Sequence, residues 1–300
     1  MQNEHNPSCR YLGIDIGGTR IKWGVIDAKG TIVRRGLADT CPEKGAEYFL
    51  RTLCALVENA GPIEGVGICT AGIVDSHAGT VLGGIENIPF LKGMPLQSLL
   101  EQAAGCRARL LNDVNAAALG EHWVGAGMGC RVLFCATIGT GIGGSLMIDG
   151  AIHNGAHFHA GEIGYMRYAG GACLETDYSA SGLVRMARAK LNIPGLGPDE
   201  FFSMVSTQNA AACEIYRHWL GGLGSALADV LIMLDPEKLI IGGGITERGT
   251  LLLEPLRSAI LSQLPEEMRS HYDIVLARCQ NSAGMLGAVK NFIQCAAPTV

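Results

Sequence analysis

Residues 11–27 read Tyr11-Leu-Gly-Ile-Asp-Ile-Gly-Gly-Thr-Arg-Ile-Lys-Trp-Gly-Val-Ile-Asp27, an apolar run, two adjacent glycines and a second apolar run. The pattern predicts strands at residues 11–16 and 20–26, because apolar segments of this length bounded by turn residues are typical of strands. Two glycines between them indicate a tight hairpin turn. The chain therefore opens with a strand, a glycine loop and a second strand.

A similar segment begins at Arg131 and includes the loop Gly139-Thr-Gly-Ile-Gly-Gly144. Ile16-Gly17 and Ile26-Asp27 recur as Ile138-Gly139 and Ile148-Asp149 at one constant offset. Two dipeptides could match by chance, but a common register across a whole strand–loop–strand segment favours duplication. We therefore expect two related lobes, each opening with such a hairpin.

The rest of the chain alternates apolar strand patterns with helical periodicity. Further strands are expected at residues 66–69, 107–111, 131–138, 145–148 and 238–241, and helices at 43–59, 114–123, 210–234, 251–264 and 283–295. No low-complexity linker separates the halves. This alternation predicts the α/β class.

Composition excludes several classes of protein. The 300 residues carry a net charge of −5 and have 48% hydrophobic content, which argues against a disordered chain and against a dedicated nucleic-acid or anionic-membrane binder. We find no apolar run long enough to span a membrane and no signal peptide. The 11 cysteines are scattered without a CxxC pair, which favours free thiols and a cytoplasmic location.

The loop Asp15-Ile-Gly-Gly-Thr19 is a candidate phosphate site. Glycines let backbone N–H groups approach an anion, and the threonine hydroxyl adds a donor. The alternative is an ordinary hairpin turn. That alternative leaves Asp15 unexplained, because a carboxylate ends an otherwise apolar strand where it could hold Mg²⁺ through water.

The second loop matches the pattern GxGxxG, which invites an interpretation as an NAD site. That fingerprint requires a helix directly after the glycines. Here Ser145-Leu-Met-Ile148 predicts a strand, and the chain has no P-loop motif. A phosphate-facing hairpin with hydroxyl donors at Thr137 and Thr140 remains.

Polar residues outside the loops have plainer alternatives. Asn112-Asp113 precedes a helix, where either residue could serve only as its N-cap. Glu162 and Glu175 lie among glycines and could accept hydrogen bonds from a polyol or simply face solvent. A metal site at the three histidines 153, 157 and 159 is disfavoured, because no ligand spacing completes it.

The sequence resembles the ROK family of sugar kinases and sugar-responsive repressors over nearly its whole length. The motifs that carry the resemblance are Asp15-Ile-Gly-Gly-Thr19 with Lys22, the run from Asn112-Asp113 to Gly120-Glu121, Thr137 to Gly144, Gly161-Glu-Ile-Gly164, and Asp235-Pro with Gly242-Gly-Gly244. The resemblance implies an actin-like, ribonuclease-H-like fold of two lobes around a cleft, homodimers, and ATP-dependent phosphorylation of a sugar hydroxyl, usually the 6-OH. We assign residues 1–118 and 284–300 to a small lobe and 119–283 to a large lobe.

The resemblance also implies roles for residues. Asp113 would be the general base, and Asp15 would place Mg²⁺ through water. The ATP and phosphate contacts would come from Asp15, Gly17, Gly18, Thr19, Lys22, Thr137, Gly139, Thr140, Gly141, Gly243 and Gly244. Sugar contacts would come from Gly72, Asn87, Asn112, Asp113, Glu162, Tyr165 and Glu175.

The sequence departs from the family at the zinc motif of many members. Tyr165 replaces its histidine, and only Cys173 and Glu175 remain of the following cysteine-rich loop, so we predict no structural zinc. Family members without the zinc motif include β-glucoside kinases. Glucose, N-acetylmannosamine, allose and β-glucosides therefore stay open as substrates, and a sugar-sensing regulator that does not bind DNA stays open as an alternative.

Overall fold

The computed structural model describes residues 9–167 and 172–296, which group into two compact units. Unit 1 comprises residues 9–129, 154–159 and 278–296, and unit 2 comprises the described residues between 130 and 153 and between 160 and 277. The sequence-based division, with residues 119–283 in one lobe, remains a prediction. Residue 118 lies inside one helix, α3 (Asp113–Val124).

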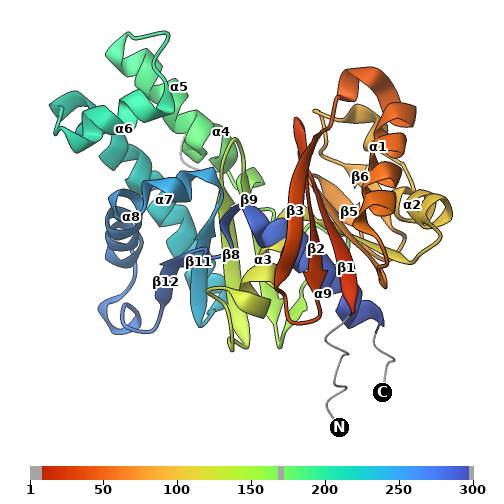
Figure 1. The fold of residues 1–300 in the computed structure, drawn as a ribbon. Coiled ribbons are helices and arrows are strands. Elements are labelled where there is room, and N and C mark those ends of the chain that lie inside the picture. Colours follow the sequence, from red (N-terminus) through yellow and green to blue (C-terminus); the bar gives the residue numbers. More distant parts are fainter. Residues whose placement is uncertain (1–8, 168–171, 297–300) are drawn as a thin grey trace. The chain divides into compact units, whose positions relative to one another are not determined.

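Unit 1 is built on a five-stranded sheet in the order β3-β2-β1-β4-β7 (Figure 1). The strands are β1 (Arg10–Ile16), β2 (Arg20–Asp27), β3 (Ile32–Asp39), β4 (Gly65–Thr70) and β7 (Ala108–Asn112). The first three pair antiparallel, whereas β4 runs parallel to β1 and β7 runs parallel to β4. The other elements are α1 (Gly45–Ala60), α2 (Leu96–Ala104), α3, α9 (Ala283–Ala296), the short 3-10 helices η1 (Pro42–Lys44), η2 (Pro89–Leu91) and η6 (Gln280–Ser282), and the hairpin of β5 (Ile73–Asp75) and β6 (Thr80–Gly83).

Unit 2 has its own sheet in the order β10-β9-β8-β11-β12. The strands are β8 (Val132–Ile138), β9 (Ile142–Ile148), β10 (Ala151–Ile152), β11 (Lys238–Gly242) and β12 (Asp273–Leu276). The helices are α4 (Leu174–Tyr178), α5 (Ala180–Leu191), α6 (Pro198–Ser206), α7 (Ala210–Leu234), α8 (Thr250–Ser262), η3 (Ile163–Tyr165), η4 (Gly244–Arg248) and η5 (Glu266–Met268).

The two sheets repeat one topology. In each sheet the first strand of the glycine hairpin is central, its hairpin partner and one more strand lie antiparallel on one side, and two parallel strands lie on the other. This shared order is what duplication of one unit predicts. It also places each glycine loop at the carboxyl end of a central strand.

Each unit buries its own core. In unit 1, Leu12, Ile14 and Ile16 of β1 pack in a cluster with residues of α1 and α2. The opposite face receives α9, whose backbone approaches so closely that a side chain on Gly13 would meet the Met285 carbonyl at 2.5 Å. Part of the unusual glycine content thus serves sheet–helix packing.

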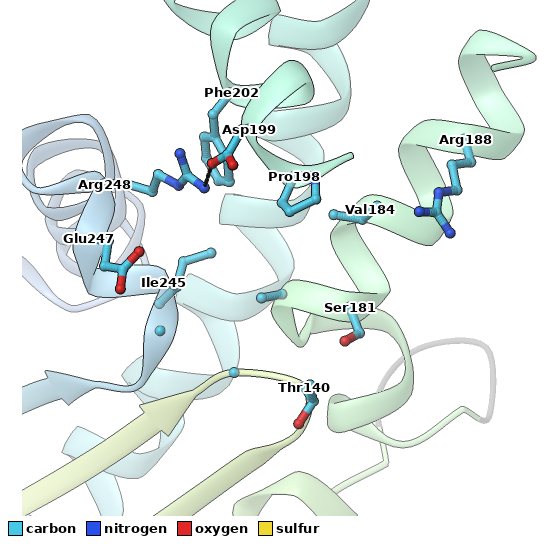
Figure 2. A pocket seen from close by; sticks show the side chains of 13 residues that line it. Thr140, Ser181, Val184, Arg188, Pro198, Asp199, Phe202, Ile245, Glu247 and Arg248 are labelled. Carbon is cyan, nitrogen blue, oxygen red and sulfur yellow. Dashed lines mark hydrogen bonds and ion pairs between the residues drawn. The ribbon is translucent and has the colours of Figure 1, made fainter. Parts of the chain in front are cut away.

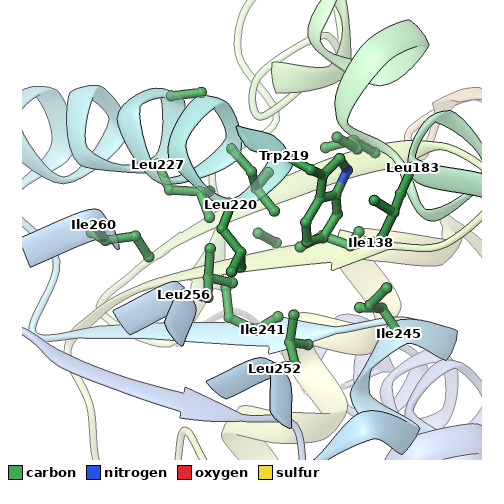
Figure 3. Packing of buried hydrophobic residues seen from close by; sticks show 14 of the residues in the cluster. Ile138, Leu183, Trp219, Leu220, Leu227, Ile241, Ile245, Leu252, Leu256 and Ile260 are labelled. Carbon is green, nitrogen blue, oxygen red and sulfur yellow. The ribbon is translucent and has the colours of Figure 1, made fainter. Parts of the chain in front are cut away.

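The core of unit 2 gathers around α7 (Figure 3). Trp219 is fully buried among leucine and isoleucine side chains, and its indole N–H donates to the Ser179 carbonyl at 3.2 Å. Burying a side chain of this size contributes on the order of 2–3 kcal/mol. This hydrogen bond fixes the junction between α4 and α5.

The sequence-based elements are confirmed within a few residues, with two differences. First, β9 begins at Ile142 rather than at 145, so the strand starts inside the glycine loop. Second, the strands β3, β5, β6, β10 and β12 and the helices α2 and α4 to α6 were not expected. β3, with the sequence IVRRGLAD, is a largely exposed edge strand in which no residue is buried.

Candidate active site

The first glycine loop is held by its neighbours in unit 1. The Gly17 N–H donates to the Arg20 carbonyl at 3.0 Å and closes the turn between β1 and β2. From β3's end, the Thr40 hydroxyl donates to the Gly17 carbonyl at 2.7 Å and the Thr40 N–H donates to the Thr19 carbonyl at 3.0 Å. The backbone of this loop is therefore fixed before any ligand binds.

Asp15 lies at the base of this loop and pairs with the cross-strand residue Lys22 at 3.3 Å. Its carboxylate faces the start of α9, where a side chain on Gly284 would meet both Asp15 Oδ2 at 2.9 Å and Cys69 Sγ at 3.1 Å. Burial raises the pKa of the Cys69 thiol well above its usual range, and the charges of Asp15 and Asp113 raise it further. The charges of Asp15 and Asp113 therefore both act on one buried thiol.

The sequence left open whether Asn112 or Asp113 is the N-cap of α3, and the structure assigns this position to Asn112. Asn112 is the N-cap of α3 and accepts from the N–H groups of Val114 at 2.9 Å and Asn115 at 3.0 Å. Asp113 follows in the first turn, where its Oδ1 accepts from the Asn112 amide at 3.1 Å. Asp113 Oδ1 also accepts from the Val114 N–H at 2.9 Å, but the N-cap position itself is filled by Asn112.

Two sequence-predicted sugar residues lie close to these groups. The Asn112 amide donates to the Gly72 carbonyl at 2.9 Å, and Gly72 has a φ of +92° at a point where a side chain would collide with the Gly83 carbonyl. Asn87 packs against the first loop, since a Cβ on Gly18 would lie 3.1 Å from that of Asn87. Unit 1 thus brings its predicted phosphate and sugar residues to one end of its sheet.

The second glycine loop connects β8 and β9 in unit 2. The Gly139 N–H donates to the Gly141 carbonyl at 2.9 Å, and the Gly139 carbonyl accepts from Ala180 N–H at 2.9 Å. The Ile142 N–H donates to Glu175 Oε2 at 3.0 Å. Because β9 starts at Ile142, no helix follows the glycines, which removes the structural basis for an NAD site.

The end of β11 reaches the same loop. Thr137 is the strand partner of Gly242, and a side chain on Gly243, whose φ is +85°, would meet the Ile138 carbonyl at 2.3 Å. Only glycine allows this approach. The predicted nucleotide residues of unit 2 are therefore neighbours although they lie about a hundred residues apart in the sequence.

A cavity of about 550 Å³ opens beside this loop and is lined by 13 residues (Figure 2). Gly139, Thr140 and Gly244 contribute the predicted nucleotide residues, while the other lining residues come from α5, α6 and η4. Arg248 pairs with Asp199 at 2.5 Å, and its guanidinium lies 4.6 Å from the centre of the Phe202 ring. The cavity is large enough for a nucleoside and carries cationic and aromatic groups.

Glu162 and Glu175 form an acidic pair in unit 2. Burial raises the pKa of Glu162, and the negative charge of Glu175 raises it further. Glu175 is exposed, as is Tyr165, which is 66% accessible at the end of η3. These side chains can offer acceptors and a phenol to a polyhydroxylated ligand.

Several residues of these sites were not predicted from the sequence. Ser181, Val184 and Arg188 line the cavity from one face of α5, and their helical spacing was the available signal. The link of Glu175 to the glycine loop had no local signal, because it joins residues 33 positions apart. The buried Glu121 belonged to a quoted motif, yet nothing in the sequence indicated its partners.

The predicted absence of zinc concerns a segment that is only partly described. Residues 168–171 belong to the segment that was compared with the zinc motif, and they lie outside the described residues. Among those described, no group of three or more His, Cys, Asp or Glu side chains is arranged to hold a metal ion. The prediction of a chain without structural zinc stays a prediction.

Comparison with known proteins places these features in a family. A model of the ROK family matches residues 11–294. The chain is 32% identical to a glucokinase of Streptomyces coelicolor (92% of this chain, 95% of the relative) and 29% identical to a beta-glucoside kinase of Listeria innocua (95% and 98%). A ROK family glucokinase from Streptomyces griseus, solved in complex with glucose and AMPPNP, superposes with a TM-score of 0.82 at 32% identity and covers 94% of this chain and 98% of its own.

Fold, site and relatives together define an ATP-dependent sugar kinase with the two-domain, actin-like ATPase fold. The chain belongs to the ROK family. In the described part of the chain, no helix is long and apolar enough to cross a membrane. All 11 cysteines are free thiols, as their scattered spacing predicts.

Proposed function

We propose that this kinase transfers the γ-phosphate of ATP to the 6-hydroxyl of a hexose, with Asp113 as the general base. The observation that carries the proposal is that Asn112, and not Asp113, is the N-cap of α3. Asp113 lies in the first turn of this helix, near enough for its charge, like that of Asp15, to raise the pKa of the buried Cys69 thiol. A carboxylate held in this way can accept the hydroxyl proton as phosphoryl transfer proceeds.

Nucleotide binding is assigned to the two glycine loops and to the cavity of unit 2. Gly17, Gly18 and Thr19 would contact phosphates from unit 1, and Thr137, Gly139, Thr140 and Gly141 would do so from unit 2. The cavity next to Gly244 would receive the adenosine, with Gly243 keeping the backbone close to β8. Support comes from the size of the cavity and from its position beside the second loop.

The donor set of unit 1 fits a magnesium ion that is held mainly by nucleotide phosphates and water. Asp15 supplies one carboxylate, and Lys22, 3.3 Å away, balances its charge when no ion is present. One carboxylate with water and phosphate oxygens is a usual environment for Mg²⁺. The ion would neutralise charge on the phosphates, while Asp15 would orient one of its waters.

Sugar hydroxyls would be bound by Asn87, Asn112 and the Gly72 backbone in unit 1, and by Glu162, Tyr165 and Glu175 in unit 2. The similarity to glucokinases favours glucose as the substrate. Tyr165 in the position of the family's zinc-motif histidine supports β-glucosides as a second candidate. We further propose a cytoplasmic homodimer, from the scattered thiols and from the family resemblance.

The test is ADP release measured with glucose, N-acetylmannosamine, allose and a β-glucoside. Asp113→Asn should lower kcat about 10²- to 10⁴-fold with the best sugar, because it removes the general base and leaves binding groups in place. The matched control is Asp149→Asn, an exposed turn residue beyond the far end of β9, which should retain full activity. An Asp113→Asn enzyme as active as the wild type refutes the assignment, and absence of phosphorylation at the 6-position by NMR refutes the acceptor.

A further inference from the structure

The second glycine loop is attached to the α4–α5 segment at two points. Glu175 Oε2 accepts from the Ile142 N–H at 3.0 Å, and the Ala180 N–H donates to the Gly139 carbonyl at 2.9 Å. The first contact comes from α4 and the second from the start of α5. The loop between Gly139 and Ile142 is therefore held at both ends by one short segment of chain.

The Glu175 carboxylate is closely packed against the glycine loop. A side chain on Gly141 would lie 2.3 Å from Glu175 Oε2, and one on Gly164 would lie 2.3 Å from the Ile142 carbonyl and 3.3 Å from Glu175 Cβ. Glycines at these two positions leave room for the carboxylate against the loop. The Gly161–Gly164 motif, the loop and α4 thus meet around Glu175.

The segment that carries Glu175 is itself anchored in the core of unit 2. The Ser179 carbonyl between α4 and α5 accepts from buried Trp219, and the Ser179 hydroxyl accepts from the Gly182 N–H at 3.0 Å as the N-cap of α5. The Glu175 side chain is exposed, so its free oxygen can reach a ligand. A fixed backbone with an exposed carboxylate is suited to sensing a ligand and holding the loop.

We propose that Glu175 is a positioning residue that couples sugar binding to the conformation of the phosphate-binding loop at residues 139–142. The proposal rests on the proposed function, in which Glu175 accepts a hydrogen bond from a sugar hydroxyl. A hydroxyl on Oε1 restricts the carboxylate to the rotamer in which Oε2 holds the Ile142 N–H. Sugar therefore orders the loop for ATP, and by thermodynamic reciprocity the nucleotide tightens sugar binding by the same factor.

The experiment measures the dissociation constant of a non-hydrolysable ATP analogue with and without saturating glucose, or whichever panel sugar is phosphorylated best. In the wild type we expect sugar to tighten analogue binding about 5-fold or more. Glu175→Ala should abolish this difference and raise the KM for ATP as well as the KM for sugar. Glu175→Gln keeps an oxygen for the Ile142 N–H and should restore the KM for ATP toward the wild-type value. Glu214→Ala, an exposed residue on α7, is the control and should change neither value.

Gly141→Ala provides a second, independent route to the same contact. Its methyl group displaces the Glu175 carboxylate, so the tightening of analogue binding by sugar should fall in the wild-type background. Any direct effect of the methyl group on phosphate binding is present with and without sugar and cancels in this ratio. The same substitution added to Glu175→Ala should leave the ratio unchanged, because the group that it displaces is gone. Additive effects of the two substitutions overturn the coupling.

Hydrogen exchange of the ligand-free protein separates failure of this inference from failure of the proposed function. Glu175→Ala should speed exchange in the peptide spanning residues 139–144 and leave α7 unchanged. If exchange does not change, or if the variant raises only the KM for sugar, the coupling is wrong. If exchange does change but no sugar is phosphorylated by the wild type, the contact stands and the proposed function fails.

Discussion

Glu121 offers the sharpest test of how unit 1 is held together. Its side chain is fully buried, and it accepts from three backbone N–H groups. These belong to Ala126 at 2.7 Å, Arg278 at 3.0 Å and Cys279 at 2.6 Å, so the carboxylate joins the end of α3 to the segment before α9. A side chain on Gly125 would lie 2.1 Å from the same carboxylate, so only glycine leaves it room.

The cost of removing this carboxylate follows from its partners. Glu121→Ala leaves three buried donors unsatisfied at about 1–3 kcal/mol each, and water entering the space offsets part of that cost. We expect a loss of about 3–6 kcal/mol in the free energy of unfolding of unit 1. Glu121→Gln keeps one oxygen but turns an NH₂ group toward at least one donor, which should cost about 1.5–3 kcal/mol.

The assay is native-state hydrogen exchange of peptides from α3 and α9, with α7 of unit 2 as an internal reference. This readout assigns the loss to a unit, which a single melting temperature of a two-unit protein does not. Glu214→Gln, the same chemical change on the exposed face of α7, should alter stability by no more than about 0.5 kcal/mol. A loss below about 1 kcal/mol for Glu121→Ala would show that the three hydrogen bonds do not stabilise the unit as reasoned.

Two further predictions concern titration. Because burial, and then the charge of Glu175, raise the pKa of Glu162, the folded state binds this proton more tightly than the unfolded state. The free energy of unfolding should therefore fall as pH rises from the ordinary carboxyl pKa through the raised one, and Glu162→Gln should remove that part of the slope in urea titrations; an unchanged slope contradicts the shift. Burial, followed by the charge of Glu121, raises the pKa of the Cys279 thiol to about 12, so at pH 8 it should react with iodoacetamide far more slowly than exposed Cys295. Mass spectrometry of the labelled peptides measures both rates, equal labelling counts against the shift, and Glu121→Gln should increase labelling of Cys279.

The sequence predicted the glycine hairpins well because their information is local. Alternation of apolar residues fixed β1 and β2 to within a residue or two, and the recurrence at residues 138 and 148 indicated a second copy. Edge strand β3 was not predicted because none of its residues is buried, and its exposed positions mix apolar Val33 and Leu37 with charged residues. The helices α4 to α6 were not predicted from the sequence, because short helices depend on packing, here against α7, for their stability.

The candidate site residues could likewise be predicted only where the sequence signal is local. Asp15 stands out locally as a carboxylate at the end of an apolar strand, whereas the role of Asp113 was predicted from the family resemblance. The partners of Glu121 lie up to 158 positions away, and those of Glu175 lie 33 positions away. Contacts of this length are set by topology, which no spacing in a single sequence records.

Asn112 limits how the proposed sugar-binding residues can be re-engineered. Its amide oxygen satisfies two N–H groups of α3 while its amide NH₂ holds the Gly72 carbonyl. Aspartate and serine, both good caps, cannot reproduce an acceptor and a fixed donor in this geometry. A library that varies this position for a new acceptor sugar therefore also varies the start of α3 and the conformation of the Gly72 turn. Under the proposed function, substrate range is more safely broadened at Tyr165, whose side chain is 66% exposed.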